Sequence, residues 1–214
     1  MLRMSNLSVF TMTAILLCGV SLKASVIVAG TNLDRTGFYF VADAAAPVGA
    51  LSIEQLFSVS TPVDLTSLSI NAASFSNQTL QVQLFSGEGF QSTSVLLQTF
   101  NLNVSGGFNG LLTGIPTITT TTSLHLGGGN YSLVLSDPGS SSDLIYLNAA
   151  IASNTPDGSL GGVQNSVGFS SPESIVFSLE GTVTPEPGTI WPCTLGLLIA
   201  GLWSIGRAKR KGVC

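Results

Sequence analysis

The sequence has very little charge. Only 8 % of its 214 residues are charged, whereas typical soluble domains have about 25 %. The stretch 25–186 contains a single basic residue, Arg35, and all eleven acidic residues, which gives it a net charge of −10. Nucleic-acid binding is therefore excluded, because it requires Lys and Arg to neutralise phosphates. With 44 % hydrophobic residues, the chain also lacks the composition of a disordered protein.

Cysteine is missing from the middle of the chain. The three cysteines are Cys18, Cys193 and Cys214, and all of them lie in the end segments. A domain between these ends has no disulfide bond, so its stability has to come from the burial of apolar side chains.

Residues for common catalytic sites are also scarce. His125 is the only histidine, it alternates with Leu124 and Leu126, and we expect it to point outward from a strand. No neighbouring nucleophile, no Gly-x-Ser-x-Gly motif, no Cys/His cluster and no phosphate-binding loop accompanies it. We therefore predict that the protein is not an enzyme.

The N-terminal segment predicts a secretory signal peptide over Met1–Ala24. Arg3 provides the basic start, an apolar run follows over 9–17, and a small residue ends the segment. The run is too short to cross a bilayer comfortably. Cys18 does not indicate a lipoprotein, because the preceding Leu17 is large where such signals need a small residue.

The C-terminal segment predicts a short transmembrane helix over 189–206, which is uncharged and close to the lower length limit. Trp191 and Trp203 stand near its two ends, where interfacial aromatic residues are expected. A basic tail follows directly, and the positive-inside rule keeps it in the cytoplasm. The tail consists of Arg207, Lys209, Arg210 and Lys211.

The three residues Pro185, Glu186 and Pro187 lie in an extended, non-helical segment before this helix. Together with the apolar helix and the basic tail, they make 184–211 resemble the PEP-CTERM sorting domain of bacterial exported proteins. The resemblance implies that an exosortase-type membrane peptidase recognises the Pro-Glu-Pro element and cuts near it. It also implies export through the inner membrane, transient anchoring, and a final place in the cell envelope or outside the cell. A GPI-type signal is a poorer match, because it lacks the basic tail.

The middle of the chain, 25–183, predicts one domain of about ten short strands, because Val, Ile, Thr, Phe and Leu recur in short runs divided by turn residues. The fold class is therefore all-β, an antiparallel β-sandwich or jelly roll. The expected strands are Phe38–Val41, Ser52–Val59, Val63–Ala72, Thr79–Phe85, Val95–Val104, Thr117–Leu126, Tyr131–Leu135, Leu144–Ala149, Val167–Ser170 and Ile175–Val183.

Alternation within these strands predicts their inner faces. Leu80, Val82 and Leu84 should lie on one face of their strand, and two glutamines on the other. The same pattern alternates the apolar residues of 100–104 with two asparagines. The outer faces should therefore carry neutral Ser, Thr, Asn and Gln, without the Lys residues that usually protect sheet edges.

Two phrases in the middle resemble those of anchored bacterial β-sandwich modules of unassigned activity. They are Phe57-Ser58-Val59-Ser60-Thr61-Pro62 and Gly129-Asn130-Tyr131-Ser132-Leu133. This resemblance implies the fold only.

Three acidic residues in predicted loops are candidates for a metal site: Asp137, Asp143 and Asp157. Calcium is the ion that such carboxylates would bind, although Asp, Pro, Gly and Ser are also the residues that turns require. No other cofactor is expected. The same Asp137 and Asp143 are the one carboxylate pair that a glycosidase could use.

These observations favour an exported protein with a structural or adhesive role in the cell envelope or an exopolysaccharide matrix. Its expected partners are the exosortase-type peptidase, and exopolysaccharide or other matrix proteins. A carbohydrate-binding module is the alternative hypothesis, and a secreted hydrolase is the third.

Overall fold

The computed structural model describes residues 24–42, 50–111, 114–139, 142–153 and 157–184, with the backbone alone for 31–36 and 151–153. These residues belong to one compact unit, Ala24–Thr184. Strands and turns make up this unit, and the described part of the chain contains no helix.

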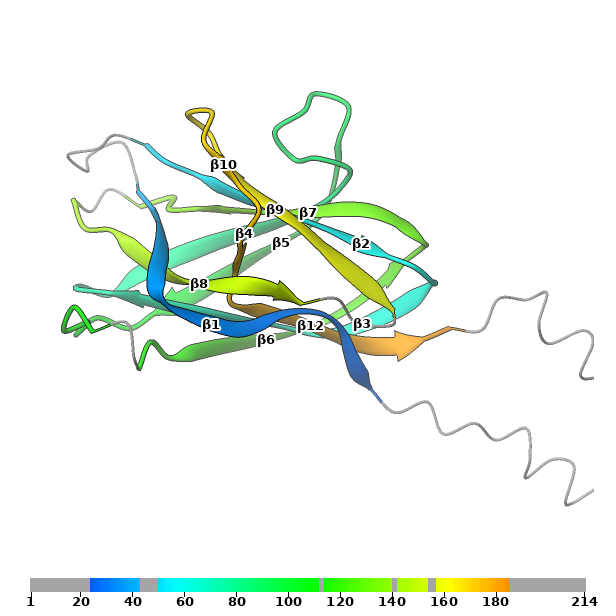
Figure 1. Cartoon of the computed structure of the whole chain (residues 1–214), viewed down its shortest axis with the longest axis horizontal. Helices are drawn as coiled ribbons and strands as arrows, with labels where there is room; N and C mark the ends of the chain where they lie inside the picture. The colour runs from blue at the N-terminus through cyan, green and yellow to red at the C-terminus, as the bar shows by residue number, and fades with distance from the viewer. Residues whose placement is uncertain (1–23, 43–49, 112–113, 140–141, 154–156, 185–214) are drawn as a thin grey trace, which may run out of the picture. The chain divides into compact units, whose positions relative to one another are not determined.

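Two six-stranded antiparallel sheets pack face to face, as the sandwich prediction requires (Figure 1). Sheet 1 consists, in spatial order, of β11 (Ser174–Ile175), β8 (Ile145–Ser153), β1 (Ser25–Val41), β12 (Phe177–Val183), β3 (Val63–Ser74) and β6 (Thr117–Leu126). Sheet 2 consists of β10 (Ser170–Ser171), β9 (Gly158–Asn165), β2 (Ile53–Val59), β7 (Gly129–Ser136), β4 (Gln78–Ser86) and β5 (Val95–Val104).

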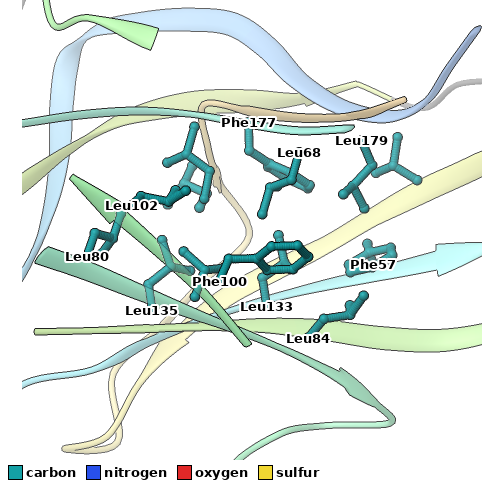
Figure 2. Close-up of a cluster of buried hydrophobic side chains, with 14 of the residues drawn as sticks. Phe57, Leu68, Leu80, Leu84, Phe100, Leu102, Leu133, Leu135, Phe177 and Leu179 are labelled. Atoms are coloured by element: carbon teal, nitrogen blue, oxygen red, sulfur yellow. The ribbon is translucent and has the colours of Figure 1, made fainter. Parts of the chain in front are cut away.

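The core lies between the two sheets and is built by the predicted alternation. Leu80, Val82 and Leu84 of β4 are fully buried, and Phe100, Leu102 and Val104, which alternate along β5, are buried as well. Figure 2 shows the labelled side chains of these two strands facing Leu68 and Leu179 from the opposite sheet. Apolar burial between two sheets is therefore the main stabilising contribution in a domain without cysteine.

The two phrases that resemble bacterial sandwich modules meet in this core. Their strands, β2 and β7, are neighbours, and Phe57 pairs directly with Tyr131. The two rings stack with centroids 5.7 Å apart. Phe57 also contacts Phe177 of sheet 1, with a centroid distance of 6.3 Å, so one aromatic residue contacts both sheets.

A fully buried polar side chain, Gln55 of β2, connects the sheets. Its Oε1 accepts hydrogen bonds from Ser174 Oγ at 2.8 Å and from Ile175 N at 2.9 Å, both on β11. Its Nε2 donates to the carbonyls of Leu56 at 2.8 Å and Gly161 at 3.1 Å. All four hydrogen-bonding positions of the amide are therefore used, which makes its burial tolerable.

The strand prediction is wrong around 158–170. Strand β9 occupies Gly158–Asn165, where no strand is predicted, whereas the predicted strand Val167–Ser170 forms mainly a turn. The glycines of β9 are there because neighbours approach closely: a Cβ on Gly161 would lie 2.7 Å from the Leu56 Cβ. In the turn, Gly168 has a φ of +94°, and Asn165 Oδ1 accepts hydrogen bonds from two following amides.

The first strand is also longer than predicted, because β1 begins at Ser25 rather than Phe38. Its pairing with β8 shifts register twice, between Ala29 and Asn32 and between Leu33 and Phe38, so the apolar alternation is interrupted. A glycine within it, Gly30, allows the carbonyl of Ile175 to approach to a position 2.3 Å from where a Cβ would lie. Neither the register shifts nor the close approach at Gly30 can be recognised from the sequence of the strand.

The sandwich has two different ends. Ser25, near the start of the described residues, pairs with Gly181, and Thr184 N donates to Pro62 O at 2.8 Å, so the chain enters and leaves at the same end (Figure 1). We call this the terminal end. The opposite end, the loop end, includes the connections 75–77, 105–111 and 137–139.

Replacing Gln55 by Leu is expected to lower the free energy of unfolding by about 2–4 kcal/mol, because the Ile175 amide and the Gly161 carbonyl lose a buried partner. Gln83→Leu, a half-buried glutamine on the outer face of β4, is the matched control and should change it by less than about 0.5 kcal/mol. Urea unfolding measures both. Equal effects of the two substitutions would contradict the role given to Gln55.

Candidate functional site

An open groove lies on the outer side of sheet 2 at the loop end, with a volume of about 1090 Å³. Its floor is formed by the antiparallel pair β4–β5, in which Thr79 lies opposite Asn103 and Gln81 opposite Asn101. Side chains at such directly opposed positions are close neighbours. We call this site the amide groove, because its polar lining is mostly primary amides: Asn77, Gln78, Gln81, Asn101 and Asn103.

Three of these amides, those of Gln81, Asn101 and Asn103, are available for a ligand, whereas Gln78 is buried and its Nε2 donates to Ser74 Oγ at 2.7 Å. Asn101 and Asn103 are exposed, and Gln81 Nε2 lies 3.5 Å from Asn101 Oδ1, at the limit of a hydrogen bond. Within the described part of the chain, the side chain of Asn103 has no hydrogen-bond partner. A primary amide offers two donors and one acceptor oxygen, so these groups can both give and receive hydrogen bonds.

The segment Asp137–Gly139, between β7 and β8, forms one wall of the groove. Asp137 is only 7 % exposed, and its Oδ1 accepts a hydrogen bond from Gly139 N at 2.8 Å. This is the turn geometry in which an aspartate bonds the backbone two residues ahead.

The three calcium candidates do not come together. Asp137 lies at the loop end, but Asp157 precedes β9 at the terminal end, where its carbonyl accepts a hydrogen bond from Ser60 N. Asp143 lies in the same connection as Asp137. Over the described ranges, no three His, Cys, Asp or Glu side chains are close enough to bind one metal ion.

Four aromatic side chains gather at the loop end, on the outer side of sheet 1. Tyr146 of β8 is in the middle, with ring centroids of Phe38, Phe75 and Phe108 at 5.6, 5.7 and 5.0 Å. Phe38 and Phe75 are 46 % and 51 % exposed. We call these four residues the aromatic cluster, and sequence reasoning missed it because its members come from four separate segments.

The turn 75–77 joins the aromatic cluster to the amide groove, since it contains both Phe75 and Asn77. The loop after β5 is fixed to this turn by two hydrogen bonds and to the last residue of β3 by a third. Gly106 N donates to Asn77 Oδ1 at 2.8 Å, Gly107 N to the Phe75 carbonyl at 3.1 Å, and Phe108 N to the Ser74 carbonyl at 3.0 Å. The polar and the aromatic surface are therefore held in a defined arrangement.

His125 is exposed, as its alternation with two leucines predicts, and lies on β6. Its Nδ1 lies 2.7 Å from Asp64 Oδ1 of the neighbouring β3. Both side chains are more than half exposed, so the pair contributes little to stability. Among the described residues, no nucleophile accompanies it in a hydrogen bond.

A second depression, of about 460 Å³, lies on sheet 2 at the terminal end. The loop after β4 covers part of the same sheet face: Gly89 N donates to Ser132 Oγ at 2.8 Å and to the fully buried carboxylate of Glu54. Gln164 Nε2 donates to the other oxygen of Glu54 at 2.5 Å. In the described structure, neutral donors alone bind this carboxylate, so its role is to fix the loop.

Tyr131 of β7 also lines this depression. Burial raises the pKa of its phenol, and a hydrogen bond from its hydroxyl to the Gly127 carbonyl at 2.9 Å opposes the rise. The phenol is therefore a structural group with one backbone partner.

The segments predicted to direct export lie outside the described residues: all of the predicted signal peptide except Ala24, the Pro-Glu-Pro element, the helix over 189–206 and the basic tail. Within the described ranges, no helix is long and apolar enough to cross a membrane.

No protein-family model and no curated protein matches the chain.

The raised pKa of Tyr131 predicts a pH dependence of stability. The folded chain holds the phenolic proton more tightly than the unfolded chain, so the free energy of unfolding should fall as the pH rises above about 10. Tyr131→Phe should cost about 1 kcal/mol at neutral pH and should show a smaller alkaline decline. Urea unfolding between pH 8 and 11 measures this, and an identical decline in both proteins would contradict it.

Proposed function

We propose that this chain is an exported bacterial protein of the cell envelope or extracellular matrix, with a structural or adhesive role. In this proposal the signal peptide starts export, and the Pro-Glu-Pro element, helix and basic tail hold the chain in the inner membrane until an exosortase-type peptidase processes it. The observation that carries the structural role is the pair of open sheet edges on one side of the sandwich.

These edges are β5 of sheet 2 and β6 of sheet 1, each ten residues long. They lie next to each other, since Thr122 Oγ1 donates to Gln98 Oε1 at 2.7 Å. His125 is the one titratable residue in either strand, and neither strand contains proline. Long edges normally carry Lys, Pro or other protective features, so an edge of this kind favours pairing with a further strand.

Strand β5 adds apolar surface to its free edge. Val95, Leu96 and Leu97 are 60 %, 47 % and 36 % exposed. Consecutive exposed apolar residues on an edge strand are typical of a surface that a partner covers.

A second copy of this chain is the partner that these edges fit. Two copies related by a two-fold axis would extend a sheet through antiparallel pairing of identical strands. Acidic residues of the domain lie outside β5 and β6, so the pairing strands bring no like charges together. Pairing of this type closes a dimer, and each dimer brings two sandwiches together, which can cross-link a matrix.

The amide groove favours a second candidate, a carbohydrate-binding module. Primary amides are suited to sugar hydroxyls, which both donate and accept hydrogen bonds. Aromatic residues make up only 7 % of the sequence, but four of them gather at the same end as the groove.

Thr119→Lys, in the middle of β6, is expected to abolish self-association, because it places a charge on the pairing edge. Thr66→Lys is the matched control: it makes the same change at an exposed position of β3, an inner strand of the same sheet. Sedimentation of the full chain in a density-matched detergent measures both. The parent and Thr66→Lys should form dimers or larger species at tens of micromolar; a monomeric parent would overturn the structural role.

Replacement of Pro185, Glu186 and Pro187 by Ala should leave the chain uncut in the inner membrane, because the peptidase loses its recognition element. Fractionation and immunoblotting in a host that contains an exosortase measure this. Thr66→Ala, on the sandwich surface, controls for expression and export. Normal processing and release of the triple variant would refute the sorting proposal.

A further inference from the structure

We propose that the amide groove is a binding site for a neutral polysaccharide, with β4 and β5 as its floor. This inference deepens the proposed function and rests on it, because the matrix supplies the polymer. Its ligand class follows from three properties of the groove: hydrogen-bonding capacity, charge and size.

The hydrogen-bonding groups of the groove are uncharged and of mixed character. Two pairs, Thr79 with Asn103 and Gln81 with Asn101, lie in successive rows along the β4–β5 pair. Rows of this kind recur about every 6.7 Å along a strand. They present donors and acceptors side by side, which is what a chain of hydroxyl groups requires.

The charge of the groove and of the domain favours a neutral polymer over an acidic one. The groove lining contains no basic residue, and its one acidic residue, Asp137, is mostly buried and bonded to Gly139 N. The stretch 25–186 has a net charge of −10, which repels anions over the whole domain. Uronates, sulfated sugars and phosphates therefore have no counter-charge here.

Size favours a chain over a single sugar. The groove volume of about 1090 Å³ lies at the upper limit of the usual small-molecule range. The groove is open and shallow, so hydrogen bonds to a ligand compete with hydrogen bonds to water, and each site binds weakly. A polymer gains affinity because it contacts several protein copies.

The test uses the full chain in a detergent without a sugar headgroup, and affinity gel electrophoresis as the readout. The neutral probes are dextran, pullulan, galactomannan, xyloglucan and mixed-linkage β-glucan; hyaluronate is the acidic probe. We expect at least one neutral polymer to retard the chain and hyaluronate to leave its mobility unchanged.

The decisive variant is the double substitution Asn101→Ala and Asn103→Ala. Both side chains are exposed, so the fold should be kept, and urea unfolding verifies this. The apparent Kd should rise about tenfold, the effect of losing two ordinary hydrogen bonds. Asn130→Ala is the matched control, an exposed asparagine of β7 at the terminal end, and should bind like the parent.

Two outcomes would overturn the inference: no retardation by any of the five neutral polymers, or equal retardation of the double variant and the parent. Thr119→Lys distinguishes polysaccharide binding by the groove from the proposed self-association. If that variant is monomeric and still retarded, the groove binds polysaccharide without pairing of the sheet edges. If the parent never self-associates but binds polysaccharide, the structural role fails and the site stands.

Discussion

Burial of two apolar sheet faces against each other is the constraint on which the rest of this structure depends. With no cysteine in the domain, the faces have to remain together without a covalent bond. Phe57 contacts both sheets, and Gln55 fixes how one sheet lies on the other: it accepts two hydrogen bonds from β11 of sheet 1 and donates two within sheet 2. Apolar contacts alone are not directional, so the amide adds a specific alignment that the leucines cannot provide.

The same constraint explains how much of the fold could be predicted. On β4, Gln78–Leu84 pair with β5 without a register shift, so Leu80, Val82 and Leu84 alternate visibly, and the structure confirms their predicted face. On β9, steric contact decides the sequence instead: Gly158 and Gly162 are required because carbonyls of Ser58 and Ser171 lie where a Cβ would be. Such contacts come from distant segments, and no local pattern reveals them.

The candidate site could be predicted only in its parts. Alternation placed Asn101 and Asn103 on an outer face, which the structure confirms. That Gln81 lies opposite Asn101 depends on the register of the β4–β5 hairpin, which contains a bulge, and the wall at Asp137 comes from a separate connection. The aromatic cluster had no signal at all, because spacing along a chain does not report proximity between Phe38 and Phe108.

The position of the chain ends has a mechanical consequence. Thr184 leaves at the terminal end and the groove lies at the loop end, so a tension between a bound polymer and the C-terminal tail would act along the strands. A load in this direction shears neighbouring strands and strains many ladder hydrogen bonds simultaneously. Tension between the two chain ends would instead separate β1 from β12 bond by bond, starting at Ser25 and Gly181. The sandwich is thus expected to resist force far better along one direction than along the other.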